Sequence, residues 1–194
     1  AEKHALSELI AKVMQGWKVK AVKLTDEFSM TQHEDLKKLC DDLGIGYSCS
    51  VWDLSSLKDI MALEPDHIKI PSAMNTHMAL LKEMAEKYSG DMHVSLGMTT
   101  LVEEEAIIEL FRSSGRLKDV VLYHCVSGYP VPVQDICLLG IRRLVDLYAG
   151  DVKAIGFSAH YTGIGLDGPA YVLGAEYIER HFTLDRSWRG TDHS

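Results

Sequence analysis

From residue 44 onward, apolar and polar positions follow two alternating patterns. Short runs rich in β-branched and aromatic residues, typical of strands, are each followed by a longer segment with apolar residues at helical spacing. The strand-like runs cover residues 46–51, 67–71, 92–96, 119–125, 154–158 and 177–182. The helical segments cover residues 55–63, 78–88, 101–113, 135–148 and 168–174. Strands that alternate with helices predict βαβ units and a parallel sheet.

Two further signals refine this outline. Residues 6–15 have a helical pattern, and residues 18–24 could form either an early strand or part of an insertion. Thr100, followed three residues later by Glu103, is the sequence signature of a capping box. This pair predicts that a helix begins at residue 101.

The strand spacing suits either an open doubly wound sheet or a (β/α)8 TIM barrel. A phosphate loop or dinucleotide fingerprint would favour the open sheet, but Gly163-Ile164-Gly165 lacks the third glycine and the strand–helix context. Polar residues instead follow the ends of many strands, as in a barrel whose active site lies at its carboxyl end. These residues are Ser72, Asn75, Ser95, His124, Ser127, His160 and His181. We therefore predict an α/β fold of the TIM-barrel type.

The length of the chain limits how much of a barrel it can form. A (β/α)8 barrel takes about 250 residues, whereas this sequence has 194. We expect a single TIM-barrel domain over residues 1–194 that is incomplete at the N-terminus and after the last strand.

Charge and composition exclude several classes of protein. The formal net charge of −8 gives no general attraction to nucleic acid. No run of about 18 apolar residues predicts a membrane span, and the first ten residues lack a signal-peptide core. Four scattered cysteines, at positions 40, 49, 125 and 137, are too few for a disulfide framework and are expected to act as small hydrophobic side chains. We therefore expect a cytoplasmic protein.

Two histidines at strand ends give the clearest indication of chemistry. His160 and His181 lie one β/α unit apart, so their imidazoles could meet on neighbouring strands and hold a divalent metal with open positions for water and substrate. Alternatively, both rings only make hydrogen bonds. Glu179 shares the face of His181 and could ligate the metal, orient the imidazole or pair with Arg180 or another neighbour.

Other candidate residues are a lysine and three serines. Lys69 lies between two isoleucines in a strand pattern, so it either faces the barrel interior or protects an exposed edge. Facing inward, it could bind phosphate or carboxylate, or form a Schiff base. Ser72, Ser95 and Ser127 could donate hydrogen bonds to an anion or simply cap helices. A serine hydrolase is excluded, because the sequence has no Gly-x-Ser-x-Gly elbow.

Residues 28–194 resemble the barrel domain of the sialic acid synthase (N-acetylneuraminate synthase) family. The matching stretches are 67–72 (HIKIPS), 95–100 (SLGMTT), 124–132 (HCVSGYPVP), 156–164 (GFSAHYTGI) and 179–194 (ERHFTLDRSWRGTDHS). Members condense phosphoenolpyruvate with an N-acetylmannosamine-type sugar to a nine-carbon acidic sugar, using manganese or magnesium. They commonly form homodimers.

The resemblance implies a role for each candidate residue. His160 and His181 correspond to metal ligands, and Glu179 to a carboxylate beside the metal. Lys69 and the three serines correspond to residues that bind phosphoenolpyruvate and offset its negative charge. Tyr129 and Asp192 correspond to residues near the sugar, and Lys69, Glu179 and Asp192 are the expected catalytic residues.

Among the departures of the sequence from the family pattern, two bear on activity. Met74 stands where members carry an acid that manages a proton. We also expect the small antifreeze-like domain that follows the barrel in most members to be absent. Two alternatives to the synthase therefore stay open: a catalytically degenerate homologue that binds a sugar or phosphate ligand, and an unrelated metal-dependent aldolase.

Overall fold

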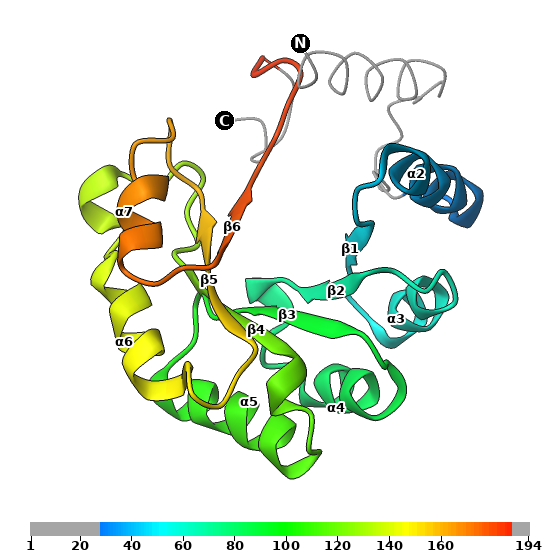
Figure 1. Cartoon of the computed structure of the whole chain (residues 1–194), viewed down its shortest axis with the longest axis horizontal. Coiled ribbons are helices and arrows are strands. Elements are labelled where there is room, and N and C mark those ends of the chain that lie inside the picture. Colours follow the sequence, from blue (N-terminus) through cyan, green and yellow to red (C-terminus); the bar gives the residue numbers. More distant parts are fainter. Residues whose placement is uncertain (1–27, 188–194) are drawn as a thin grey trace.

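Six parallel strands form a single curved sheet in the computed structural model, which describes residues 28–187. The strands are β1 (Ser48–Ser50), β2 (His67–Ile70), β3 (Asp91–Ser95), β4 (Val120–Cys125), β5 (Ala154–Ala159) and β6 (Tyr177–Arg180). Each strand pairs with the next one in the sequence, so the order in the sheet is the order in the chain. The sheet curls into a half-barrel, as Figure 1 shows. The predicted α/β partial barrel is therefore confirmed.

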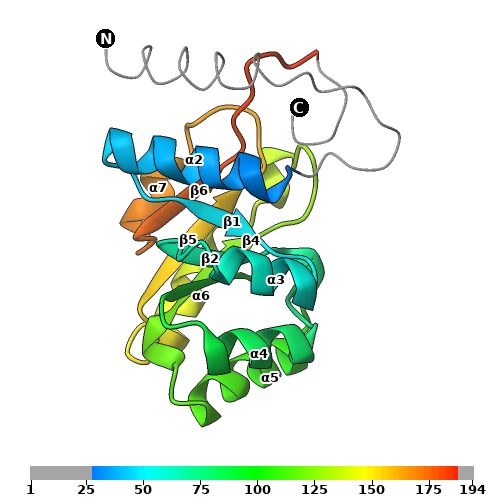
Figure 2. The same cartoon turned by 90° about the vertical axis from the view of Figure 1, so that its right-hand side faces the viewer.

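Helices cover the outer, convex side of this sheet (Figures 1 and 2). They are α3 (Leu54–Met61), α4 (Met78–Lys87), α5 (Leu101–Ser113), α6 (Leu139–Tyr148) and α7 (Asp167–Val172), while α2 (Met30–Leu43) lies beside β1. Thr100 caps α5 in the predicted capping box. In the described part of the chain, no helix has the length and apolar character needed to cross a bilayer.

The alternation of side chains along each strand gives the sheet two different faces. The face beneath the helices is apolar and forms the main core, with fully buried residues such as Ile68, Val94, Leu122 and Phe157. The opposite, concave face has only a small apolar cluster of Val121, Tyr123 and Ala154. Polar and charged side chains from the remaining inward positions therefore share the concave space.

Two helices differ from the sequence prediction. Helix α6 begins at Leu139 instead of residue 135, because Val133–Asp135 forms a 3₁₀ turn and Cys137 has a left-handed φ of 52°. Helix α2 was not expected, although Ser29 and Gln32 form a capping box at its start and Gly44 ends it in the left-handed conformation. None of its residues is buried, so the strong apolar pattern of the other helices is missing. The segments at 6–15 and 18–24 lie outside the described residues.

One buried carboxylate joins α5 to α6. Glu104 is 4% exposed, and both of its oxygens accept hydrogen bonds from the Arg143 guanidinium, at 2.9 and 2.6 Å. The Tyr148 hydroxyl donates a third bond at 2.9 Å. A buried carboxylate is tolerated only when it is paired in this way.

We expect Arg143→Leu to lower the free energy of unfolding by about 2 kcal/mol, since it leaves Glu104 buried with only the tyrosine as a partner. Urea denaturation measures the change. Arg142→Leu is the matched control, because Arg142 pairs with Asp146 on the surface, where both side chains are more than half exposed, and its loss should cost about 0.5 kcal/mol or less. Equal effects of the two substitutions would contradict this account of Glu104.

Candidate functional site

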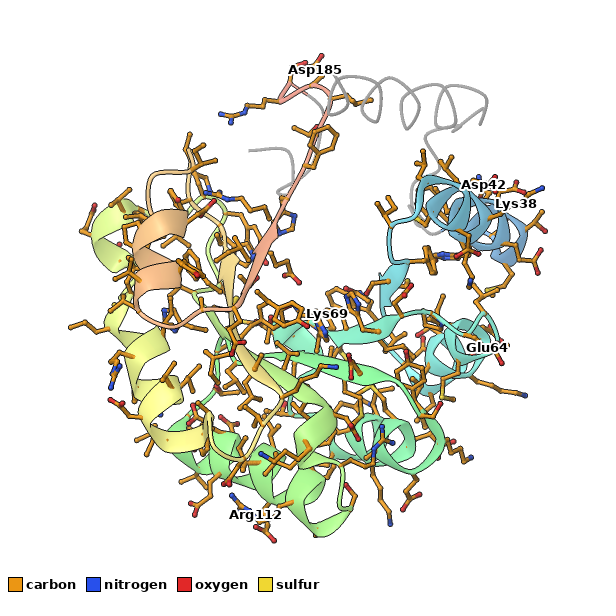
Figure 3. The ribbon with its side chains drawn as sticks, in the orientation of Figure 1. Lys38, Asp42, Glu64, Lys69, Arg112 and Asp185 are labelled. Carbon is orange, nitrogen blue, oxygen red and sulfur yellow. The ribbon has the colours of Figure 1, made fainter. Side chains whose placement is uncertain are left out.

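The concave face at the carboxyl ends of the strands gathers most of the candidate residues. The strand register places Ser95 beside Tyr123, Cys125 beside Ser158, and Ser158 beside Glu179. Each of these residues therefore points into the half-barrel from its own strand. Figure 3 shows Lys69 on the inner side of the curved sheet. Of the two orientations open for Lys69, the structure has the inward one.

Lys69 and Glu179 form an ion pair across the concave face, from β2 to β6. The lysine side chain is 7% exposed and that of Glu179 is 39% exposed. The Lys69 ammonium also lies 4.1 Å from the centre of the Tyr123 ring, a cation–π distance. Burial lowers the pKa of Lys69, and the charge of Glu179 opposes that shift.

Ser158 extends this pair toward His160. Its hydroxyl donates to Glu179 Oε1 at 2.8 Å and lies 3.5 Å from His160 Nε2. Burial tends to raise the pKa of Glu179, but the Lys69 ammonium and the hydrogen bonds from Lys69 and Ser158 lower it overall. Glu179 is therefore an ionised carboxylate whose partner is Lys69 rather than Arg180, which bonds to Asp167.

Two of the three predicted serines, Ser72 and Ser127, come together around Gly97. The Ser72 hydroxyl accepts a hydrogen bond from Gly97 N at 3.2 Å. A Cβ on Gly97 would lie 2.5 Å from both Ser72 Oγ and Ser127 Oγ, so only glycine leaves this space open. The Oγ atoms of Ser95 and Ser127 are buried and have no hydrogen-bond partner among the residues that the structure describes. Buried hydroxyls without partners are uncommon, and here they indicate a cradle for a polar ligand.

Asn75 fixes the backbone of this cradle at Ser95 and Gly97. It is 2% exposed and donates to the carbonyl oxygens of Ser95 and Gly97, both at 2.9 Å. Met74, one residue earlier, packs against the hydrophobic core. The short 3₁₀ turn Ser72–Met74 therefore supplies a hydroxyl to the cradle but no acid.

His160 and His181 lie together at the ends of β5 and β6, with ring centres 5.1 Å apart. The Tyr129 ring is 4.4 Å from that of His160 and 5.6 Å from that of His181. His160 Nδ1 donates to the Val126 carbonyl at 2.9 Å, which leaves the Nε2 lone pair to face the site. The proton of Ser158 is directed to Glu179, so it does not occupy that lone pair.

The imidazoles of His160 and His181 are suited to be two of the ligands of a divalent metal ion. A backbone carbonyl that orients a histidine is the usual support of an imidazole ligand. Among residues 28–187, no three His, Cys, Asp or Glu side chains form a group that could enclose a metal. Two imidazoles would therefore leave several coordination positions for water and substrate.

Cys125 belongs to the site, which the cysteine pattern did not predict. Its sulfur accepts from Ser72 Oγ at 3.3 Å and lies 3.9 Å from His160 Nδ1. Burial tends to raise the pKa of this thiol, but the contacts with His160 and Ser72 lower it overall. The expectation that all four thiols act only as small hydrophobes is therefore wrong for Cys125.

Not every predicted residue lies on the concave face in the structure. His124 points to the outer face, where Nε2 bonds to the Ile136 carbonyl at 2.9 Å and the ring stacks on Phe157. Asp192 lies outside the described residues. Sequence reasoning missed Ser158 and Tyr123, although both occupy inward positions that the alternation in their strands identifies.

We expect Glu179→Gln to destabilise the chain by about 2 kcal/mol at pH 7, because it leaves the buried Lys69 ammonium without its counter-charge. The deficit should shrink as the pH rises, since the folded-state pKa of Lys69 is already lowered by burial and a neutral amine tolerates burial. Urea denaturation at pH 7 and pH 9.5 measures this trend. Glu109→Gln, which removes an exposed partner of Arg112, is the control. A deficit that grows with pH would contradict the assignment.

Comparisons with known proteins show which family this chain belongs to. A model of the NeuB family matches residues 7–194. The N-acetylneuraminate-9-phosphate synthase of Drosophila melanogaster is 38% identical over 167 residues, which are 86% of this chain and 44% of that protein. The N,N'-diacetyllegionaminic acid synthase of Campylobacter jejuni is 33% identical over 168 residues, 86% of this chain and 49% of that protein.

A solved structure shows the same likeness. The N-acetylneuraminic acid synthetase of Leptospira borgpetersenii, crystallised with citrate, superposes with a TM-score of 0.79 at 29% identity. The match covers 86% of this chain and 56% of that one. The chain thus spans about half the length of the curated relatives it matches. The family model and these relatives agree across nearly all of the sequence, and the chain belongs to the NeuB family.

Proposed function

We propose that this chain carries the barrel part of a synthase that condenses phosphoenolpyruvate with an N-acetylmannosamine-type sugar to a nine-carbon sialic (nonulosonic) acid. The observation that supports it most is the arrangement on the concave face. This face holds the buried Lys69 ammonium, the hydroxyls of Ser95 and Ser127 without partners, and the imidazoles of His160 and His181. The ammonium and hydroxyls suit a small anion, and the two imidazoles suit a metal ion that polarises a carbonyl.

The phosphoenolpyruvate end is assigned to the serine cradle and Lys69. Ser95 and Ser127 would donate the hydrogen bonds that they otherwise lack, and Ser72 would complete the ring of hydroxyls. Lys69 would offset the negative charge of the phosphate or carboxylate from a buried position, where charge interactions are strong.

The sugar end is assigned to the cavity beside the two histidines. It has a volume of about 170 Å³ and is lined by Tyr129, His160 and His181, with Arg186 among the other lining residues. His160 and His181 would hold a divalent ion, manganese or magnesium, which would supply a Lewis acid to the aldehyde of the sugar. Tyr129 lies against both rings and would contact the sugar itself. Asp192, as a further sugar-binding and catalytic residue, stays a prediction.

The residues of this chain account for the charge changes of the reaction. The enol carbon of phosphoenolpyruvate bonds to the aldehyde carbon, and the π electrons of the aldehyde pass to its oxygen, which takes up a proton and becomes a hydroxyl. Water adds to the cationic carbon that results and loses a proton. The tetrahedral intermediate then collapses to the ketone as its bond to the phosphate oxygen breaks, and phosphate leaves with the proton of the new hydroxyl. Lys69 and the serines stabilise the negative phosphate throughout. Glu179 holds Lys69 and Ser158 in place, and its ionised carboxylate is the candidate acceptor for the proton of the added water.

A second candidate, a catalytically degenerate homologue that binds the same ligands, is favoured by Met74. Its side chain packs against the core, so the turn at Ser72–Met74 presents no acid to the substrate. An aldolase that forms a Schiff base is less well supported, because the Lys69 amine is paired with Glu179. Borohydride with pyruvate should therefore leave Lys69 unmodified.

The first test is the release of phosphate from phosphoenolpyruvate and N-acetylmannosamine in the presence of manganese. We expect release that depends on the metal and falls at least about 100-fold in His160→Ala, since one of the two proposed imidazole ligands is lost. His33→Asn is the control, because His33 lies on α2 and bonds to Tyr47.

Met74→Glu separates the two candidate functions. Activity in the unmodified chain supports the synthase and shows that Met74 is tolerated. Silence that Met74→Glu relieves supports the degenerate homologue. Silence in every variant, with no binding of phosphoenolpyruvate by calorimetry, would overturn both.

Gly97→Ala tests the cradle separately from the metal. The added methyl group would lie 2.5 Å from the hydroxyls of Ser72 and Ser127, so these side chains must turn away. We expect the KM for phosphoenolpyruvate to rise about tenfold or more, with the KM for the sugar unchanged. Gly165→Ala is the matched control, because a Cβ there meets nothing within 4 Å. Similar kinetics for both variants would place the anion elsewhere.

A further inference from the structure

A layer of aromatic side chains lies on the concave face next to Lys69, and the proposed reaction does not use it. The Tyr123 hydroxyl and His93 Nδ1 share a buried hydrogen bond of 2.8 Å. The His67 ring stacks on the His93 ring, with the two ring centres 3.8 Å apart. Tyr177 meets His93 edge-on at 5.2 Å. Four strands therefore contribute rings to one contiguous layer.

The Tyr123 ring has a defined position within this layer. The strand register pairs Tyr123 with Gly156 on β5. A Cβ at Gly156 would come within 2.6 Å of the Tyr123 ring. The ring therefore lies across the strand at the one point where β5 has no side chain, and His93 fixes its hydroxyl end. As a result, the face of the ring is turned to the Lys69 ammonium, 4.1 Å from its centre.

The two groups of the central hydrogen bond, His93 and Tyr123, carry no charge at neutral pH. Burial lowers the pKa of His93 to about 3, and the ammonium groups of Lys69 and Lys153 act in the same direction, so the imidazole is neutral. Burial and the negative charge of Glu179 raise the pKa of Tyr123, so its phenol stays protonated. Lys69 therefore has two kinds of partner: the carboxylate of Glu179 and the neutral face of an aromatic ring.

The contacts of Lys69 with Glu179 and with Tyr123 respond differently when a substrate phosphate or carboxylate binds. Because the ammonium has a limited number of protons to donate, an incoming phosphate or carboxylate competes with Glu179 for it. An aromatic face accepts no classical hydrogen bond and contacts the cation from one side only. It can therefore keep its contact while the ammonium changes its anionic partner.

We propose that Tyr123, fixed by His93 and accommodated by Gly156, is a positioning residue that holds the Lys69 ammonium in place for the anionic donor substrate. The proposal rests on the proposed function in that it takes phosphoenolpyruvate as this anion. It makes the inward aromatic layer part of the binding machinery rather than only part of the core.

The experiment compares Tyr123→Leu, which removes the ring, with Tyr123→Phe, which keeps the ring and loses the hydroxyl. We expect Tyr123→Leu to raise the KM for phosphoenolpyruvate about tenfold with a smaller change in kcat and no change in the KM for the sugar. Tyr123→Phe should rescue most of this loss. Tyr88→Phe is the matched control, because its buried hydroxyl donates to the Pro65 carbonyl at 2.6 Å on the helix-covered side. A merely structural role would lower the melting temperature and the active fraction without a change in that KM.

A second measurement tests the position of Lys69 without any substrate. Acetic anhydride labelling followed by peptide mass spectrometry gives the reactivity of Lys69 relative to Lys82, whose side chain is 69% exposed. We expect this ratio to rise at least threefold in Tyr123→Leu and to stay near the unmodified value in Tyr123→Phe. Unchanged labelling together with an unchanged KM would overturn the proposal. If the unmodified chain binds no phosphoenolpyruvate, the proposed function fails, and the labelling ratio alone decides whether Tyr123 holds Lys69.

Discussion

The arrangement of the concave face depends on one buried positive charge. Lys69 lies on a strand whose neighbouring residues are apolar, and its side chain is almost completely removed from solvent. An ammonium in such a place must be compensated, or the chain loses stability or the lysine loses its proton. Glu179 supplies the opposite charge from the far end of the sheet, and Ser158 holds that carboxylate from the strand between. The curvature of the sheet makes this contact possible.

Parallel strands are usually buried on both faces, and both faces then tend to be apolar. In this sheet the outer face is apolar and the inner face is largely polar. The outer face provides the burial that stabilises the sheet against its helices, so the inner face can hold polar groups. The polar groups on the inner face bond to one another, which limits the free-energy cost of burying them. The hydroxyls left without partners mark where a bound ligand would supply the missing hydrogen bonds. This division explains how chemistry and stability coexist in strands of three to six residues.

The sequence predicts the strands well and the site only in part. All six strands of the structure lie within a residue or two of the predicted runs, because β-branched and aromatic residues are concentrated there. The orientation of Lys69 could not be decided, since its partner lies 110 residues away. Helix α2 lacks buried residues and therefore lacks the pattern on which the other predictions depend. The roles of Cys125 and Tyr123 follow from neighbours across the sheet, which no local pattern contains, and His124 shows that a polar residue near a strand end can also face outward.

The order of the strands has a consequence for how the chain acquires its structure. Since each strand pairs with the next one in the sequence, the sheet can grow one β/α unit at a time, and each new pairing closes a loop no longer than one such unit. The ion pair does not follow this rule, because it joins β2 to β6. During synthesis, which proceeds from the N-terminus at about 5–20 residues per second, Lys69 emerges several seconds before its carboxylate. The Lys69 ammonium therefore lacks its carboxylate until β6 has been made and has paired with β5.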